Sequence, residues 1–293
     1  MYNVRRLLLL AKTGIFYMKL QKIFCLILVF LLPTMAYAAK DEVTWNQVLK
    51  QQFFAGKQLL KGDDVIQLST PVRAEDPALV PIKVTASFPQ TKEKYIKRIL
   101  LVIDKNPFPF VGEFEFTPDS GKADIAMRVR VNTYSYIRAI AEMNTGEHYM
   151  VKKFVKASGG CSAPIGADYD AAMARLGKMK FRLDKKAQDG KPTMAQLLIS
   201  HPNITGMQMD QVTRFKRRAH FIKQIKVTFN DKPILTAKTD IAISSDPNFR
   251  FYFVPTEQGE LKAEFTDTSC ESPVSRDVCE VGRSYTQTYR VTP

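Results

Sequence analysis

Ile125-Ala126-Met127-Arg128-Val129-Arg130-Val131 is a stretch in which apolar side chains alternate with alanine and arginine. A repeat of two predicts a β-strand with one face in a core and the other facing water. Similar short segments, separated by turn-forming residues, recur on both sides of it. In the first half of the chain they cover residues 65–69, 80–88, 95–104, 113–116, 124–131, 135–142 and 149–155.

The second half of the chain also has short strand-like segments separated by turns, although its sequence does not repeat that of the first half. Its predicted strands cover residues 178–183, 195–201, 221–230, 234–238, 249–254, 260–266 and 285–291. The turn Asn230-Asp231-Lys232-Pro233 and the break at Glu257-Gln258-Gly259 mark hairpins. Seven strands in each half predict an all-β protein of two antiparallel sandwiches.

Two short helices interrupt the strand pattern. Thr44 followed by Gln47 has the form of a capping box and predicts a helix at the start of the mature chain. Residues 166–176 have near-helical spacing amid alanines and predict a short helix or an ordered linker between the halves. The apolar face of the first helix comprises Trp45, Val48, Leu49 and Phe53.

The N-terminus has the three parts of a secretory signal peptide. Met18–Lys22 is a basic start, Ile23–Leu32 is an apolar run, and Ala36-Tyr37-Ala38 is a small-x-small cleavage site before Ala39. The apolar run has about half of the ~20 residues that a spanning helix needs, which disfavours a retained membrane anchor. We therefore expect residues 1–38 to be removed between Ala38 and Ala39, Met18 to be a possible true start, and the mature protein to be periplasmic.

Cleavage would leave three cysteines, because Cys25 lies inside the apolar run. Export implies an oxidising compartment, where paired thiols become disulfides. Cys270 and Cys279 flank a short loop and are predicted to form a disulfide that stabilises the fold by ~2–3 kcal/mol. Cys161 remains as the odd thiol, and an odd thiol in an exported protein is either a reactive group or an intermolecular bridge.

Cys161 follows Ser158-Gly159-Gly160, between the two sets of strands. Two glycines remove side-chain bulk and widen the accessible backbone conformations, so a thiol after them could enter a narrow partner site. A Gly-Gly turn that happens to precede a cysteine is the alternative interpretation. Lys152, Lys153 and Lys156 would favour the thiolate of an exposed Cys161, or they are a solvated strand end.

Charge and the remaining motifs add little. The formal net charge is +14, and the mature chain carries +9 because five basic and no acidic residues precede the cleavage site. The basic cluster at residues 214–218 is better explained by a solvated loop or an acidic protein partner than by nucleic acid, which an exported chain rarely meets. His148, His201 and His220 have no short ligand spacing, so we expect hydrogen-bonded sandwich histidines and neither a metal site nor a cofactor.

Several stretches of the first half resemble SoxY, the sulfur-substrate carrier of the periplasmic thiosulfate-oxidising system. They are Ala74-Glu75-Asp76-Pro77-Ala78-Leu79-Val80-Pro81, Lys105-Asn106-Pro107-Phe108-Pro109, Met127-Arg128-Val129-Arg130, Ala141-Glu142-Met143 and Gly159-Gly160-Cys161. The second half is similar to SoxZ. Its matching stretches are His201-Pro202-Asn203-Ile204-Thr205-Gly206, His220-Phe221-Ile222 and Phe249-Arg250-Phe251-Tyr252. The fused arrangement most resembles the SoxYZ-like carriers associated with quinoprotein dehydrogenase genes.

The resemblance implies a protein with no active site of its own. Two immunoglobulin-like sandwiches would pair, either within one chain or in a homodimer. The SoxY-like domain would cover residues 39–157, the Gly-Gly-Cys arm and linker 158–177, and the SoxZ-like domain 178–293. Cys161 would be the covalent attachment point for a sulfur-containing substrate, and Ser158, Gly159 and Gly160 its flexible mount. The partners would be periplasmic redox enzymes, either Sox-type enzymes or a quinoprotein dehydrogenase with a c-type cytochrome. The alternative function is a non-covalent adaptor for the latter system, in which Cys161 is vestigial or bridges two copies.

The chain departs from the family pattern directly after the thiol. The family arm reads Gly-Gly-Cys-Gly-Gly, whereas here Ser162-Ala163-Pro164 follows Cys161 and the chain runs on into the second domain. Proline restricts the backbone, and a segment held at both ends reaches less far than a free tail. We therefore expect a shorter excursion of Cys161 and a shallower partner site.

Overall fold

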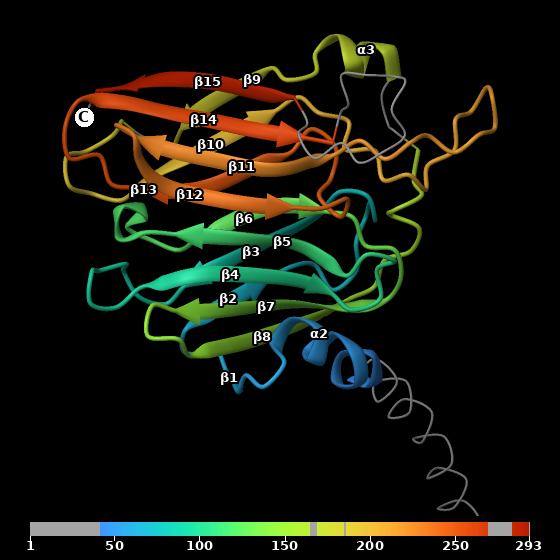
Figure 1. Cartoon of the computed structure of the whole chain (residues 1–293), viewed down its shortest axis with the longest axis horizontal. Coiled ribbons are helices and arrows are strands. Elements are labelled where there is room, and N and C mark those ends of the chain that lie inside the picture. The colour runs from blue at the N-terminus through green and yellow to red at the C-terminus, as the bar shows by residue number, and fades with distance from the viewer. Residues whose placement is uncertain (1–41, 165–168, 185, 269–282, 293) are drawn as a thin grey trace, which may run out of the picture. The chain divides into compact units, whose positions relative to one another are not determined.

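Two β-sheets form the body of residues 54–293 (Figure 1). The computed structural model describes residues 42–164, 169–184, 186–268 and 283–292, and the chain divides into two units, residues 1–53 and 54–293. The predicted signal peptide, its cleavage site and the Cys270–Cys279 disulfide lie outside the described residues. No helix in the described part of the chain has the length and apolar composition needed to cross a bilayer.

The helix predicted near the start of the mature chain is present, but its predicted cap is wrong. Residues 42–44 are already helical, a π-helix covers Trp45–Leu49, and α2 covers Lys50–Phe54. Thr44 has helical dihedral angles and its side chain makes no capping hydrogen bond, because the helix begins before it. Trp45 and Leu49 are buried as predicted, whereas Val48 is 54% exposed.

The larger sheet has nine strands. In spatial order they are β1 (Leu59–Lys61), β8 (His148–Val155), β7 (Ser135–Met143), β4 (Ile96–Ile103), β5 (Phe110–Phe116), β12 (Lys232–Thr239), β11 (Ile222–Phe229), β14 (Gly259–Asp267) and β15 (Ser284–Val291). The smaller sheet has six strands, in the order β2 (Ile66–Ser69), β3 (Val80–Ala86), β6 (Ile125–Val129), β13 (Asn248–Phe253), β10 (Thr193–Ile199) and β9 (Met179–Leu183). A 3₁₀ turn at Pro118–Ser120 and α3 (Tyr169–Ala174) complete the described elements.

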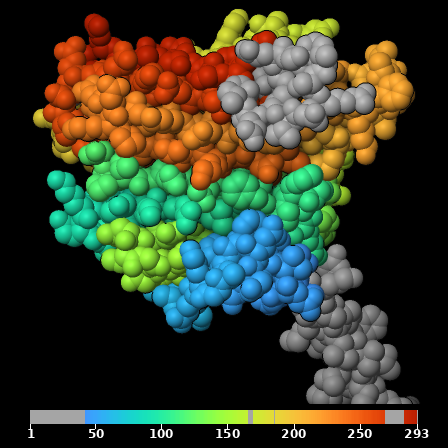
Figure 2. Space-filling model, viewed as in Figure 1, coloured from blue at the N-terminus to red at the C-terminus, as the bar shows by residue number. Residues whose placement is uncertain are grey.

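The two predicted sandwiches join edge to edge. Strand β5 of the first half pairs antiparallel with β12 of the second, from Gly112 opposite Thr239 to Phe116 opposite Leu235. The smaller sheet is joined where Ala126 of β6 lies opposite Arg250 of β13. Figure 2 shows the green residues of the first half and the orange residues of the second meeting directly along this seam. The pairing removes two exposed sheet edges, which would otherwise invite aggregation.

The predicted all-β sandwich fold is confirmed, and its core is continuous across the seam. In β6 the apolar positions 125, 127 and 129 are buried while Ala126 and Arg128 are half-buried on the other face, as the alternation predicts. Both sheets contribute their inner faces to one apolar cluster that includes Val129, Phe114 and Phe249. Phe114 of the first half and Phe249 of the second lie 6.4 Å apart, measured between ring centroids.

The predicted hairpin between β11 and β12 is also present. Asn230 and Asp231 both have positive φ angles, 47° and 62°, as a two-residue turn matching the twist of the strands requires. Strand β1 was not predicted, because three residues are too few to show a period. The short helix α3 lies within the predicted interval 166–176.

One ion pair is completely buried in the first half. The Arg138 guanidinium on β7 donates to both carboxylate oxygens of Asp104, with Nε–Oδ1 and Nη2–Oδ2 distances of 2.9 and 2.8 Å. Neither side chain is exposed. Each charge therefore depends on the other for the interactions that water would otherwise supply.

Arg138→Met should lower the free energy of unfolding by about 3–5 kcal/mol, because it removes the cation that neutralises the buried Asp104. The matched control is Arg98→Met, since Arg98 is partly exposed and pairs with Glu113 and Glu142. The free energy of unfolding of Arg98→Met should fall by no more than about 1 kcal/mol. Denaturant unfolding of both variants measures the difference, and equal losses would contradict this account of the buried pair.

Candidate functional site

Cys161 lies in the segment that follows β8, and its thiol is inside the protein. The residue is 1% exposed, so the expectation of an exposed thiol on a flexible arm is wrong for this structure. Its proposed role as an attachment point remains a prediction. Among the described residues it is a free cysteine.

The first half of the chain holds the glycines before the thiol. The backbone N–H of Gly159 donates to the carbonyl of Asn132 at 2.8 Å, and that of Gly160 donates to the carbonyl of Val131 at 3.1 Å. These acceptors lie just past the end of β6. The segment predicted as a flexible mount is therefore docked, with Ser158 exposed and Gly160 buried.

The second half holds the thiol-bearing residue itself. The Thr205 hydroxyl donates to the carbonyl of Cys161 at 2.7 Å, and the Gln208 side-chain amide donates to the carbonyl of Ala163 at 3.1 Å. Thr205 belongs to the stretch 201–206 that resembles SoxZ. Thr205 and Gln208 were not predicted as part of the site. Thr205 lies 44 residues from Cys161, and no sequence pattern indicates a contact over that separation.

The two glycines have different physical roles. Gly159 has φ of +81° and open space where a side chain would stand, so it supplies a backbone conformation that other residues rarely adopt. At Gly160 a Cβ atom would overlap the carbonyl oxygens of Pro77 and Val131. Gly160 therefore permits the close approach of the loop to the first half.

Burial controls the chemistry of the thiol. Desolvation raises the pKa of Cys161 to about 11, and the positive charge of Arg130 opposes this increase. The lysines expected to activate the thiol, Lys152, Lys153 and Lys156, do not contribute to this shift. The docked thiol is therefore protonated at neutral pH and is a poor nucleophile.

Arg130 is the charged group next to Cys161 and was not predicted as a site residue. It is 1% exposed and directly follows the end of β6, between the buried core residues Val129 and Val131. Its Nη1 donates to the carbonyl of Gly160 at 3.2 Å, while its Nε is buried with no hydrogen-bond partner among the described residues. Burial lowers the pKa of Arg130, and the charges of Cys161 and Asp76 oppose this.

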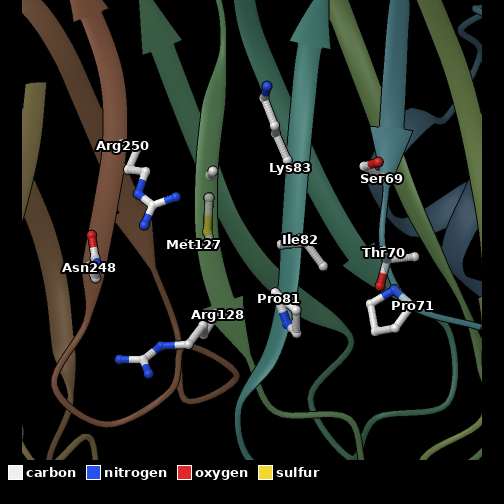
Figure 3. Close-up of a pocket in the computed structure, with 11 residues that line it drawn as sticks. Ser69, Thr70, Pro71, Pro81, Ile82, Lys83, Met127, Arg128, Asn248 and Arg250 are labelled. Atoms are coloured by element: carbon white, nitrogen blue, oxygen red, sulfur yellow. The ribbon is translucent and has the colours of Figure 1, made fainter. Parts of the chain in front are cut away.

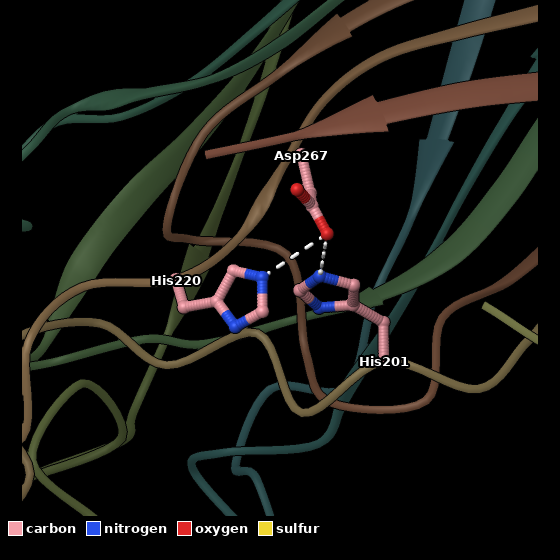
Figure 4. Close-up of side chains that lie close together, drawn as sticks. All are labelled: His201, His220 and Asp267. Carbon is pink, nitrogen blue, oxygen red and sulfur yellow. Dashed lines mark hydrogen bonds and ion pairs between the residues drawn. The ribbon is translucent and has the colours of Figure 1, made fainter. Parts of the chain in front are cut away.

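Two of the three histidines, His201 and His220, come together beside Asp267 (Figure 4). His201 and His220 both point their Nε2 atoms at Oδ2 of Asp267, at 3.3 and 3.0 Å. The backbone N–H of Asn203 donates to Nδ1 of His201 at 3.0 Å, so the proton of neutral His201 is on Nε2. Burial lowers the pKa of His201, which favours that neutral form.

The residue types in this cluster are those of a metal site, but its members are hydrogen-bonded to one another as in a site that stabilises the fold. His201, His220 and Asp267 place their candidate ligand atoms within 4.8 Å of one another. A metal would need the Nε2 lone pair of His201, and in this arrangement that nitrogen carries a proton donated to Asp267. The prediction of hydrogen-bonded histidines agrees with these contacts. Asn203 continues the network by donating to the carbonyl of Ser244 at 3.0 Å, which fixes the loop leading to Thr205.

A basic groove of about 530 Å³ lies on the outer face of the smaller sheet (Figure 3). It carries the cations Lys83, Arg128 and Arg250, and its lining residues include no carboxylate. Arg128 precedes Arg130 by two residues in the sequence, but Arg130 lies past the end of β6 and does not line the groove. The groove can hold an anionic group on this face of the sheet.

Comparisons with known families match both halves of the chain. The family model of the sulfur oxidation protein SoxY matches residues 50–161, and that of the sulphur oxidation protein SoxZ matches residues 180–276. The chain thus contains a region that matches SoxY followed by a region that matches SoxZ, called the SoxY and SoxZ domains below. The SoxY match ends at Cys161, and Thr205 and Gln208 lie in the SoxZ domain. The predicted SoxYZ-like fusion is thereby supported.

Solved structures similar to the chain include a sulfur carrier protein and a superoxide reductase. The sulfur carrier protein SoxY from Chlorobium limicola f thiosulfatophilum is 21% identical, with 42% of this chain and 96% of that chain covered and a TM-score of 0.33. A superoxide reductase (neelaredoxin) from Ignicoccus hospitalis is 17% identical over 32% of this chain and 80% of that chain, with a TM-score of 0.30. A search of curated protein sequences finds no match.

Gly160→Ala should expose the thiol, because the new Cβ cannot fit under the carbonyls of Pro77 and Val131. We expect Cys161 to react with iodoacetamide at least about tenfold faster than in the wild type, as loss of one or two loop hydrogen bonds would allow. Gly159→Ala is the matched control, since its Cβ meets open space and only the backbone conformation is strained. Mass spectrometry of the labelled protein measures the rates, and an unchanged rate in Gly160→Ala would refute the close-packing role.

The pKa shift of Cys161 predicts a loss of stability at alkaline pH. Its ordinary value of 9.0 is raised to about 11 in the folded chain, so between these values the unfolded state loses a proton that the folded state keeps. The stability associated with the buried thiol is therefore present below about pH 9 and is lost as pH rises through about 11. Between pH 8 and 11 the free energy of unfolding of the wild type should fall relative to that of Cys161→Ser. Parallel curves of unfolding free energy against pH would contradict the pKa shift.

Proposed function

We propose that this chain is a periplasmic carrier that holds a sulfur-containing group covalently on Cys161 and presents it to partner redox enzymes. The observation that carries the proposal is the Gly-Gly-Cys loop docked between a SoxY and a SoxZ domain. The SoxY and SoxZ domains support a place in sulfur oxidation, where family members act as carriers and not as catalysts. Sox carriers are generally periplasmic, which agrees with the predicted signal peptide.

The docked loop must open for the thiol to react. Five hydrogen bonds hold residues 159–163 against the rest of the protein. Two are donated by backbone N–H groups of the loop, and three are accepted by its backbone carbonyls. Each contributes about 0.5–1.5 kcal/mol net. Docking is therefore stabilised by a few kcal/mol, which leaves an open state as an accessible minor population. A partner that binds the open loop would draw Cys161 out and expose it at its ordinary pKa.

The chemistry of loading requires a redox partner. Joining the Cys161 thiol to a sulfur anion through a new S–S bond releases one proton and two electrons. The proton passes to solvent and the electrons must pass to an acceptor in the partner system, such as a c-type cytochrome. This balance agrees with partners that are redox enzymes, either Sox-type enzymes or a quinoprotein dehydrogenase system.

A non-covalent adaptor is the second candidate, and the burial of Cys161 favours it. A thiol that is 1% exposed is protected from reagents, and the basic groove at Lys83, Arg128 and Arg250 could dock an acidic partner without any covalent step. In that case Cys161 contributes packing to the loop and no chemistry.

The intact mass of protein from the periplasm separates the two functions. A carrier isolated with its partners expressed and substrate supplied should show a reducible mass increase that maps to the Cys161 peptide. Cys161→Ser should lack the increase and all partner-dependent turnover while keeping the thermal stability of the wild type within a few degrees. A free Cys161 under these conditions, with a fully active Cys161→Ser variant, would establish the adaptor.

A further inference from the structure

Two arginines are buried to the same degree, but only one has a bonded counter-ion. Arg138 makes three hydrogen bonds to the carboxylate of Asp104. Arg130 makes one, to the neutral carbonyl of Gly160, and no carboxylate is within hydrogen-bond distance of it among the described residues. A buried guanidinium without a bonded anion is unfavourable, because burial removes its water and nothing replaces the lost charge interactions.

The missing interaction faces the carrier loop. The bond from Nη1 to the Gly160 carbonyl places the guanidinium under the loop, one residue before Cys161. The adjacent Nε–H is buried and has no acceptor among the described residues. In the unloaded protein the neighbouring thiol is protonated and supplies no charge. The site therefore contains a positive charge and a free donor. Asp76 acts on this charge through space, but no anion among the described residues forms a hydrogen bond with the guanidinium.

We propose that Arg130 recognises the charge of the group carried on Cys161. An anionic adduct, such as a sulfonate-terminated group, would accept the free Nε–H and neutralise the guanidinium, so the loaded loop would dock more tightly than the unloaded one. A neutral adduct would gain no such contact and would leave the loop as open as the free thiol does. This inference rests on the proposed carrier function and adds a residue that selects anionic cargo.

As a consequence, the fraction of the loop that is docked depends on the charge of the group bound to Cys161. While the cargo is anionic, Arg130 holds it away from water and from stray thiols. When a reducing partner cleaves the S–S bond with two electrons and one proton, the anionic cargo leaves and Cys161 is again a neutral thiol. The guanidinium then lacks a hydrogen-bonded anion and the loop opens more readily. Charge-assisted hydrogen bonds of this kind are about twice as strong as neutral ones, so one contact suffices to bias the docking equilibrium.

The test loads Cys161 chemically with two adducts that differ in charge. The thiolate attacks an inner sulfur of tetrathionate, forming an S–S bond and releasing thiosulfate, which leaves an anionic sulfonate-terminated adduct. The same thiolate attacks methyl methanethiosulfonate and releases methanesulfinate, which leaves a neutral methyl disulfide. In both reactions the thiol proton goes to the buffer.

The readout is the rate at which dithiothreitol removes each adduct, divided by the rate for the same adduct on a peptide of residues 156–164. In the wild type, the anionic adduct should be protected about tenfold more than the neutral one, as one charge-assisted hydrogen bond predicts. Arg130→Gln should abolish this preference and Arg130→Lys should keep part of it. Arg98→Gln, which removes a partly exposed arginine paired with Glu113 and Glu142, should leave it unchanged.

Equal protection of the two adducts in the wild type would overturn the proposal, whatever the variants do. A preference that survives in a folded Arg130→Gln protein would overturn it as well. Because both adducts are installed by reagents, the result does not depend on whether Cys161 is loaded in the periplasm. Failure of the carrier function and failure of Arg130 recognition are therefore separate outcomes.

Discussion

The antiparallel pairing of β5 with β12 is the constraint on which the candidate site depends. It joins the SoxY and SoxZ domains through five register pairs and continues both the sheet and the core across the seam. Only because the domains are fixed in this way can Thr205 and Gln208 of the SoxZ domain hold a loop that belongs to the SoxY domain. In a chain with two independent sandwiches the loop would keep its bonds to the first half and lose those from Thr205 and Gln208. The fusion thus builds one closed site from two domains.

The two buried arginines of the first half differ in their surroundings. Arg138 is neutralised by Asp104 and stabilises the fold, whereas Arg130 lies beside a thiol that carries no charge when unloaded. Buried ion pairs contribute little net stability, but a buried charge without a bonded partner is costly, which makes it a candidate for a functional role. This difference is why we assign Arg130 to cargo recognition and Arg138 to the core.

Local patterns in the sequence predicted the strands well and the site incompletely. The alternation at 125–131 placed β6 within two residues at each end, because burial of one face is a local property. The same alternation predicted Arg130 on a wet face, and it is buried only because the loop at 157–164 covers it. Gly160 was predicted to give flexibility and is instead needed for close packing. The cluster of His201, His220 and Asp267 could not be predicted, since its members meet through the fold and not through sequence spacing.

The central claim is that Cys161 is sheltered in a docked loop that opens for reaction. The most direct measurement is the reaction rate of wild-type Cys161 with neutral 4,4′-dithiodipyridine at pH 8, followed as the reagent concentration rises. A docking free energy of a few kcal/mol predicts a rate at least about 100-fold below that of the protein unfolded in denaturant, with a plateau set by loop opening. A rate equal to that of the unfolded protein, rising linearly with reagent, would contradict the claim.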